Sequence, residues 1–159
     1  MEKRATQKGI VLIEVVIVVA ILLMVATGLI FANVVYIKTG SFTLSSTKAT
    51  LLAQEGVEAV KYIRTSGWDS NIDSLTTGTT YYLAFEPSAW SATSTEEVID
   101  GKFFRSFVLD NVDRDSDSDI ASSGTLDSNT KKLTVSVSWV GMTGTTTKQI
   151  ETYITNFLE

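Results

Sequence analysis

Hydrophobic residues are concentrated in one stretch near the start of the chain. Residues 10–37 are almost entirely apolar, whereas the residues after them are rich in Ser, Thr, Asp and Gly. About 20 consecutive apolar residues suffice to cross the hydrocarbon core of a bilayer as a helix. The pattern therefore predicts one membrane-spanning helix followed by a polar domain. Lys3, Arg4 and Lys8 precede the apolar stretch, so they should stay in the cytoplasm and leave the C-terminal domain outside.

The helical periodicity continues beyond the apolar stretch, but on one face only. After a polar patch, apolar residues recur at spacings of three and four, at Ala49, Leu52, Ala53, Gly56, Val57, Val60 and Ile63. Glu58 and Lys61 lie off this stripe, at the spacing of an i,i+3 ion pair. We expect one helix from about Ile10 to Arg64, with Gly28 and Gly40 as candidate weak points.

The rest of the chain has the pattern of strands. Runs rich in aromatic and β-branched residues occupy residues 81–85, 103–109, 133–139 and 148–154. The third run alternates apolar with hydroxyl side chains, as a half-buried strand does, and a glycine-containing turn at 141–144 should join it to the fourth. Helix first and strands afterwards predict an α+β fold, in which three to five antiparallel strands cover the amphipathic half of the helix.

The connection between helix and sheet, residues 66–101, is rich in Ser and Thr and contains Trp68 and Trp90. Tryptophan is usually substantially buried, so both side chains are expected to pack this connection onto the sheet. A role as binding anchors in an exposed, variable region is the alternative.

Composition argues against the commonest catalytic sites. The chain contains neither Cys nor His, so it lacks a disulfide framework, a thiolate nucleophile and a histidine base. It also shows no nucleophile elbow and no phosphate-binding glycine loop. Together these absences indicate that the protein is not an enzyme.

Charge argues against general binding of nucleic acids. The formal net charge is −5. Residues 1–9 contribute +2 of this, so the remainder carries −7. An acidic domain without a basic stripe is not expected to bind nucleic acid strongly.

Glu14 is an acidic residue inside the apolar stretch. An unpaired carboxylate there costs on the order of several kcal/mol, which points to a specific role. Cleavage after Gly9 would create an α-amine on Ile10, four residues before Glu14. That ammonium group on one subunit could neutralise Glu14 of the next in apolar surroundings.

The segment Lys8-Gly9-Ile10-Val11-Leu12-Ile13-Glu14 resembles the prepilin processing signal of type IV pilins and pseudopilins. The resemblance implies that a prepilin peptidase cleaves between Gly9 and Ile10, that Ile10 is then N-methylated, and that Glu14 acts in assembly. The family usually has Phe at the first mature position, where this chain has Ile10. Residues 53–60 also resemble a helix segment of minor pilin-like proteins, although this second match is less specific.

The resemblance implies that the chain has four segments and that the protein occupies a membrane and then a filament. Residues 1–9 would be the prepilin leader, 10–37 the transmembrane and assembly half of the helix, 38–67 its amphipathic half, and 68–159 the connecting loop and antiparallel sheet. The protein would be a single-pass membrane protein and then a subunit at the cell surface. Its expected partners are the prepilin peptidase, other pilin subunits, the cytoplasmic membrane and the pilus assembly machinery.

Several alternatives remain open. Within the family, the alternatives are a pilus subunit and a pseudopilin of type II secretion or DNA uptake. The sequence does not distinguish a major from a minor subunit. Outside it, the chain would be a membrane-anchored or secreted binding module that does not assemble. A secretory signal peptide cleaved after Gly28 would also explain a basic start and an apolar core, but such cores are normally ~7–15 residues long and rarely contain an acid.

No cofactor is expected, with one candidate exception in an Asp-rich segment. Asp113, Asp115, Asp117 and Asp119 occupy alternate positions and could offer oxygen ligands to Ca²⁺. The segment departs from an EF-hand, because Ser118 and Gly124 stand where the loop glycine and the bidentate Glu belong. A solvated acidic turn between strands is the favoured interpretation.

Overall fold

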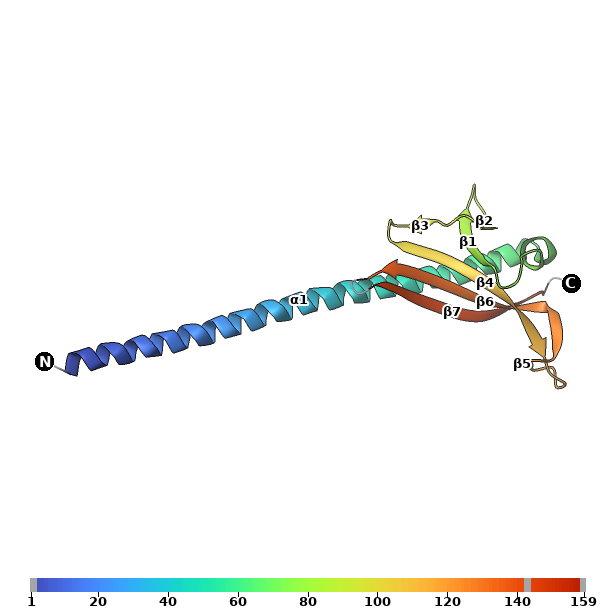
Figure 1. Cartoon of the computed structure of the whole chain (residues 1–159). Helices are drawn as coiled ribbons and strands as arrows, with labels where there is room; N and C mark the ends of the chain where they lie inside the picture. The colour runs from blue at the N-terminus through green and yellow to red at the C-terminus, as the bar shows by residue number, and fades with distance from the viewer. Residues whose placement is uncertain (1–2, 142–143, 158–159) are drawn as a thin grey trace. The chain divides into compact units, whose positions relative to one another are not determined.

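The computed structural model describes residues 3–141 and 144–157, with the backbone alone at residues 3–10. Helix α1 (Lys3–Thr65) is followed by a short π-helix, η1 (Asp69–Asp73), and by a sheet (Figure 1). The strands are β1 (Thr80–Phe85), β2 (Trp90–Thr93), β3 (Val98–Ile99), β4 (Phe103–Arg114), β5 (Ile120–Ala121), β6 (Thr125–Val140) and β7 (Thr145–Thr155). The chain forms two compact units, residues 1–44 and 45–159.

The first unit is helical. Its described side chains, from Val11 to Leu44, are all exposed. The helix runs through Gly28 and Gly40 without interruption, so neither candidate weak point ends it. It also begins before Ile10, the expected start, at Lys3. Continuity has a simple cause, because the chain's one proline is Pro87, far from this segment, and proline is the usual cause of a sharp kink.

In the second unit, the last five turns of α1 bury the predicted stripe. Ala49, Ala53 and Val60 are completely buried, and Val57 and Ile63 nearly so. Ala59 joins them although the stripe did not include it, and Leu52 is partly buried at the edge. The predicted pair of Glu58 and Lys61 forms, with 2.8 Å between Oε1 and Nζ.

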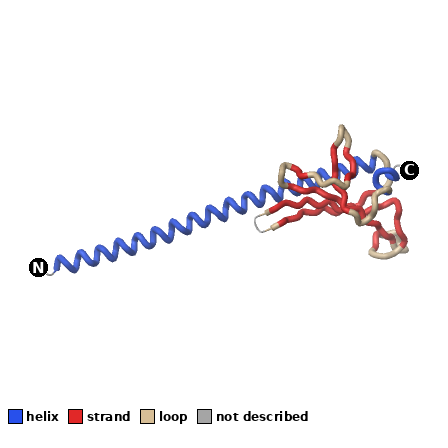
Figure 2. Tube along the Cα trace, turned by 45° about the horizontal axis from the view of Figure 1, so that its top comes forward, coloured by secondary structure: helices blue, strands red, loops and turns tan. Residues whose placement is uncertain are grey.

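The sheet is antiparallel and has the order β2-β1-β4-β6-β7, with β3 and β5 also paired to β4. Its strands are drawn in red in Figure 2. Strands β4 and β6 form its centre, in a register that pairs Phe103 with Trp139 and Phe107 with Val135. Alternate residues of both strands face the helix and are buried: Phe103, Arg105, Phe107 and Leu109 on β4, and Lys131, Leu133, Val135, Val137 and Trp139 on β6.

The α+β prediction is confirmed, but the expected number of strands was too low. The described residues form seven strands rather than three to five. All four predicted runs are strands, and β4 and β6 are considerably longer than predicted. The three unpredicted strands have only two to four residues. Such short segments show no alternation of their own, since pairing with β1 or β4 decides their conformation.

The connection between helix and sheet is more ordered than a Ser/Thr-rich sequence suggests. Trp68 lies directly before η1 and is buried in the core beside Ile72, as expected for a tryptophan that packs this segment down. Trp90 begins β2 and is only partly buried. Its indole stacks at a tilt on Phe85, with 5.1 Å between ring centroids.

Gly56 allows the helix to approach the sheet closely. A Cβ at this position would lie 2.8 Å from Cγ1 of Val135 and 3.1 Å from Cδ of Arg105. Val135 is completely buried and β-branched, so its side chain has little freedom to move away. The small residue on the helix therefore sets the distance between the helix and the centre of the sheet.

Gly56→Ala should lower the free energy of unfolding of the second unit. Overpacking costs about 1–3 kcal/mol, which exceeds the ~1 kcal/mol gained in helix propensity. The measurement is urea denaturation of the full chain in nonionic detergent. Gly40→Ala is the matched control, because nothing lies within 4 Å of a Cβ there. An equal or higher midpoint for Gly56→Ala than for the wild type would contradict this packing.

Candidate functional site

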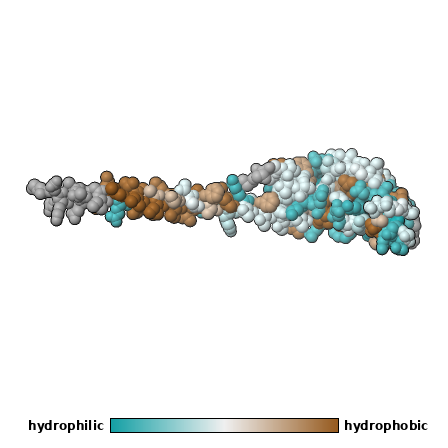
Figure 3. Space-filling model, turned by 60° about the horizontal axis from the view of Figure 1, so that its bottom comes forward, coloured by the Kyte–Doolittle hydropathy of each residue, from teal (hydrophilic) through white to brown (hydrophobic). Residues whose placement is uncertain are grey.

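The first candidate site is the apolar part of α1. Among the described residues one helix, Val11–Thr65, is long and apolar enough to cross a membrane, and its most apolar window has a mean hydropathy of 3.0. None of that window is buried within the chain. Figure 3 shows the hydrophobic colouring along this part of the helix. So much exposed apolar surface is not stable in water and needs a bilayer or other protein surfaces around it.

Two polar side chains in this segment, Thr27 and Asn33, form hydrogen bonds within the helix. The hydroxyl of Thr27 donates to the carbonyl oxygen of Leu23, and Nδ2 of Asn33 donates to that of Leu29 at 3.0 Å. Such bonds to the preceding turn let polar residues lie in an apolar environment at low cost. These residues therefore do not require a partner from outside the helix.

Glu14 differs from them. It is the one residue with a full charge between positions 11 and 37, and its side chain is exposed on the helix surface. Among the described side chains none forms an ion pair or hydrogen bond with it. The Glu14 carboxylate therefore lies among apolar side chains and has no partner among the described residues.

The expected cleavage and methylation site, Gly9 and Ile10, falls where only the backbone is described. That backbone is helical, and the side chain of Ile10 lies outside the described residues. Processing at this site stays a prediction, as does the role of Glu14 in assembly.

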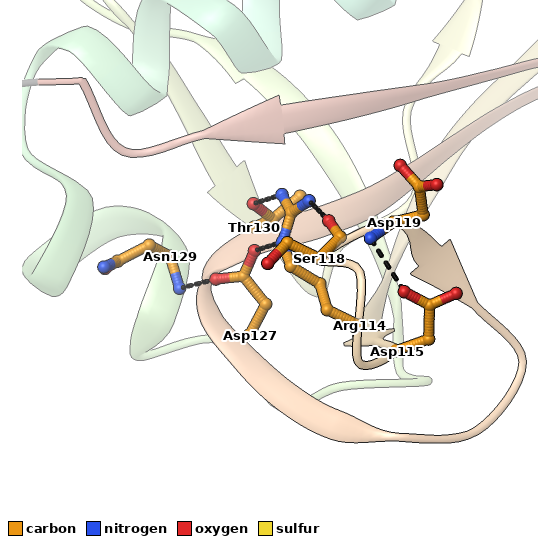
Figure 4. Close-up of polar contacts among 7 residues, drawn as sticks. All are labelled: Arg114, Asp115, Ser118, Asp119, Asp127, Asn129 and Thr130. Carbon is orange, nitrogen blue, oxygen red and sulfur yellow. Dashed lines mark hydrogen bonds and ion pairs between the residues drawn. The ribbon is translucent and has the colours of Figure 1, made fainter.

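The second candidate site is the Asp-rich loop after β4 (Figure 4). Oδ1 of Asp115 accepts hydrogen bonds from the backbone N–H groups of Asp117 and Asp119, at 2.9 and 3.0 Å. Asp113 lies earlier, near the end of β4. Within the described part of the chain, no three acidic side chains lie where they could hold a metal ion. The structure thus does not gather the four aspartates into a ligand set, and calcium binding stays a prediction.

Arg114 holds the same loop closed. Its Nε lies 2.6 Å from Oδ2 of Asp127, and its Nη1 donates to the carbonyl oxygen of Ser118 at 2.7 Å (Figure 4). Gly124 has a structural reason as well, because a Cβ there would lie 2.1 Å from the carbonyl oxygen of Arg114. Asp115, Ser118 and Gly124, which were compared with positions of a calcium loop, therefore help to hold this turn.

Two buried cations were not predicted as site residues. Arg105 and Lys131 are 6% and 8% exposed. Lys131 Nζ lies 3.3 Å from Oδ1 of Asp73 and donates to Oδ1 of Asn111 at 3.1 Å, which ties η1 to the end of the sheet. The alternation of their strands could have predicted that both cations are buried, because each lies in phase with the buried apolar residues. Alternation does not predict which residues they contact.

Comparison with protein-family models, with curated proteins and with solved structures finds no match. The class that the structure itself defines is an α+β protein with a long apolar N-terminal helix and an antiparallel sheet, which is compatible with a pilin-like fold.

Asp127→Asn should destabilise the protein at pH 7, and its difference from the wild type should shrink as the pH falls below 3.8. The hydrogen bond from Arg114, and next that from Thr130, hold the pKa of the Asp127 carboxyl below its ordinary value of 3.8. A lowered pKa contributes stability that is present above pH 3.8 and is lost as the pH falls through the folded-state pKa. Arg114 is 37% exposed, so screening limits the loss to about 0.5–1 kcal/mol.

Urea denaturation of the full chain in nonionic detergent at several pH values measures this difference. Asp117→Asn is the control, because its exposed carboxylate forms no ion pair in the described structure. A difference between Asp127→Asn and the wild type that persists unchanged at pH 2 would contradict the assignment.

Proposed function

We propose that this chain is a non-catalytic structural subunit of a type IV pilus or a related filament, held in the membrane before assembly and then packed through α1. The exposed apolar surface of residues 11–44 supports the proposal most directly. The leader ending at Gly9, with Glu14 five residues later, adds the chemical signal. The subunits that pack against this helix would determine whether the filament is a pilus or a secretion pseudopilus.

Assembly has a physical basis in this surface. In the bilayer, lipid covers the apolar side chains, and transfer into a bundle of neighbouring helices exchanges lipid contacts for contacts with other subunits. Hydrophobicity contributes little to that exchange, because lipid tails are as apolar as leucine. Packing and the neutralisation of polar groups must therefore supply the net gain.

Glu14 supplies such a polar term. Removal of residues 1–9 would free the amine of Ile10, and the ammonium of one subunit could then pair with Glu14 of its neighbour. An unpaired carboxylate in apolar surroundings is costly, so the pair favours the assembled state over the lone subunit. It also favours one axial register between subunits, since only certain offsets bring the two groups together.

Glu14→Val and Glu14→Gln should insert into the membrane and be cleaved normally but enter filaments at least about tenfold less than the wild type. Both variants remove the charge, and Glu14→Gln also keeps the size of the side chain. Immunoblotting of sheared filaments against the membrane fraction measures incorporation, and the mobility shift on leader removal measures cleavage.

Thr27→Val is the matched control for these variants. It also removes a polar group from the apolar segment, but that hydroxyl bonds within its own helix, so incorporation should be unchanged. Normal incorporation of Glu14→Gln would contradict the role of the carboxylate. Loss of incorporation in Thr27→Val as well would show that any change in this segment disturbs assembly.

A further inference from the structure

A cleft of about 280 Å³ opens in the second unit beside the β1–β2 hairpin. Its lining comes from the amphipathic part of α1, from β1 to β4 and from the loops between them, and includes Glu55, Phe85, Glu86, Glu97, Ile99 and Arg105. The volume is slightly below the ~300–1,000 Å³ of sites for drug-sized ligands. A molecule that fills it is therefore small.

Arg105 in this cleft is 94% buried, and its hydrogen bonding is incomplete. Nη1 lies 3.3 Å from the carbonyl oxygen of Leu52 and 3.3 Å from Oε2 of Glu55. The guanidinium carbon lies 5.1 Å from the ring centre of Trp90, a cation–π contact. Nε is buried and has no hydrogen-bond partner among the described residues. An orphaned donor of a charged group costs more than a lost neutral bond, so it needs an explanation.

The unpartnered Nε belongs to an edge of the guanidinium that suits a carboxylate. Nε and Nη2 present two parallel N–H groups, the arrangement that binds both oxygens of a carboxylate. Contact with Nε requires a neighbour to turn aside. Glu55, which is exposed, and Trp90, which is half-buried, both lie against the guanidinium, so rotation of either side chain would be the way to admit an oxygen atom.

The other charges in the lining restrict the ligand further. Glu55, Glu86 and Glu97 are exposed acids, and with Arg105 they give the lining a formal charge of −2. A simple anion would be repelled by this field, and a simple cation would leave the Arg105 edge unpartnered. A ligand with both an ammonium and a carboxylate group satisfies both sides.

We propose that this cleft binds a free α-amino acid with an apolar side chain. Its carboxylate would occupy the Nε–Nη2 edge of Arg105, its ammonium group would face Glu86 and Glu97, and its side chain would lie against Phe85 and Ile99. The proposal does not depend on filament assembly, because all the lining residues belong to the second unit.

Three probes with one side chain and different charges test this assignment: L-leucine, N-acetyl-L-leucine and L-leucinamide. Each is titrated into the full chain in nonionic detergent by calorimetry, with tryptophan fluorescence as a second readout. Trp68 and Trp139 are buried, so a fluorescence change reports chiefly on Trp90. L-Leucine should bind at least about tenfold more tightly than either analogue, since each analogue lacks one charge.

Two substitutions on neighbouring glutamates separate the site from general electrostatics. Glu97→Gln should weaken L-leucine binding several-fold, whereas Glu96→Gln, next to it and outside the lining, should not. Arg105→Lys keeps the charge but lacks the two-donor edge, so it should abolish the preference for L-leucine over L-leucinamide.

Circular dichroism verifies that each variant is folded. If Arg105→Lys does not fold, the comparison of the three probes on the wild type still tests the proposal. Absence of L-leucine binding at millimolar concentration would overturn the proposal. Equal binding of the three probes, or equal effects of Glu96→Gln and Glu97→Gln, would overturn it as well.

Discussion

The packing of small residues on α1 against β4 and β6 is the contact on which the second unit depends. Ala49, Ala53 and Gly56 present almost no side chain to the sheet, so large residues such as Phe107 and Trp139 fill the layer between helix and sheet from the other side. This complementarity leaves no room for a Cβ at Gly56. It also places Arg105 against the helix backbone at Leu52, which creates both the buried cation and the cleft beside it.

The same helix has a different relation to its surroundings over residues 11–44. There its side chains are exposed on every face, and those of Thr27 and Asn33 bond back to their own helix. Glu14 differs from these two, because its carboxylate has no partner among the described side chains. An unpaired carboxylate is costly in a membrane, and under the proposed function the ammonium group of another subunit would supply the partner.

Sequence patterns predicted the fold class because its main elements are strongly periodic. The stripe from Ala49 to Ile63 and the alternation along residues 133–139 each have one face that must be buried. The short strands β2, β3 and β5 were missed because tertiary pairing, not local pattern, makes them. Arg105 was missed as a site residue because its importance lies in contacts with Glu55 and Trp90, distant in the sequence from it. Cleavage after Gly9 was predicted from local residues alone, and it stays a prediction because the fold does not depend on it.

The most direct test of the account is the mass and N-terminal sequence of the protein isolated from its native membranes. We predict a mature chain that begins at Ile10 and carries the extra mass of one methyl group. That result would establish prepilin processing and the free amine that Glu14 needs. A chain that begins at Leu29 would indicate an ordinary signal peptide. An intact chain from Met1, in cells with an active prepilin peptidase, would indicate a simple membrane anchor, and either result would contradict the account.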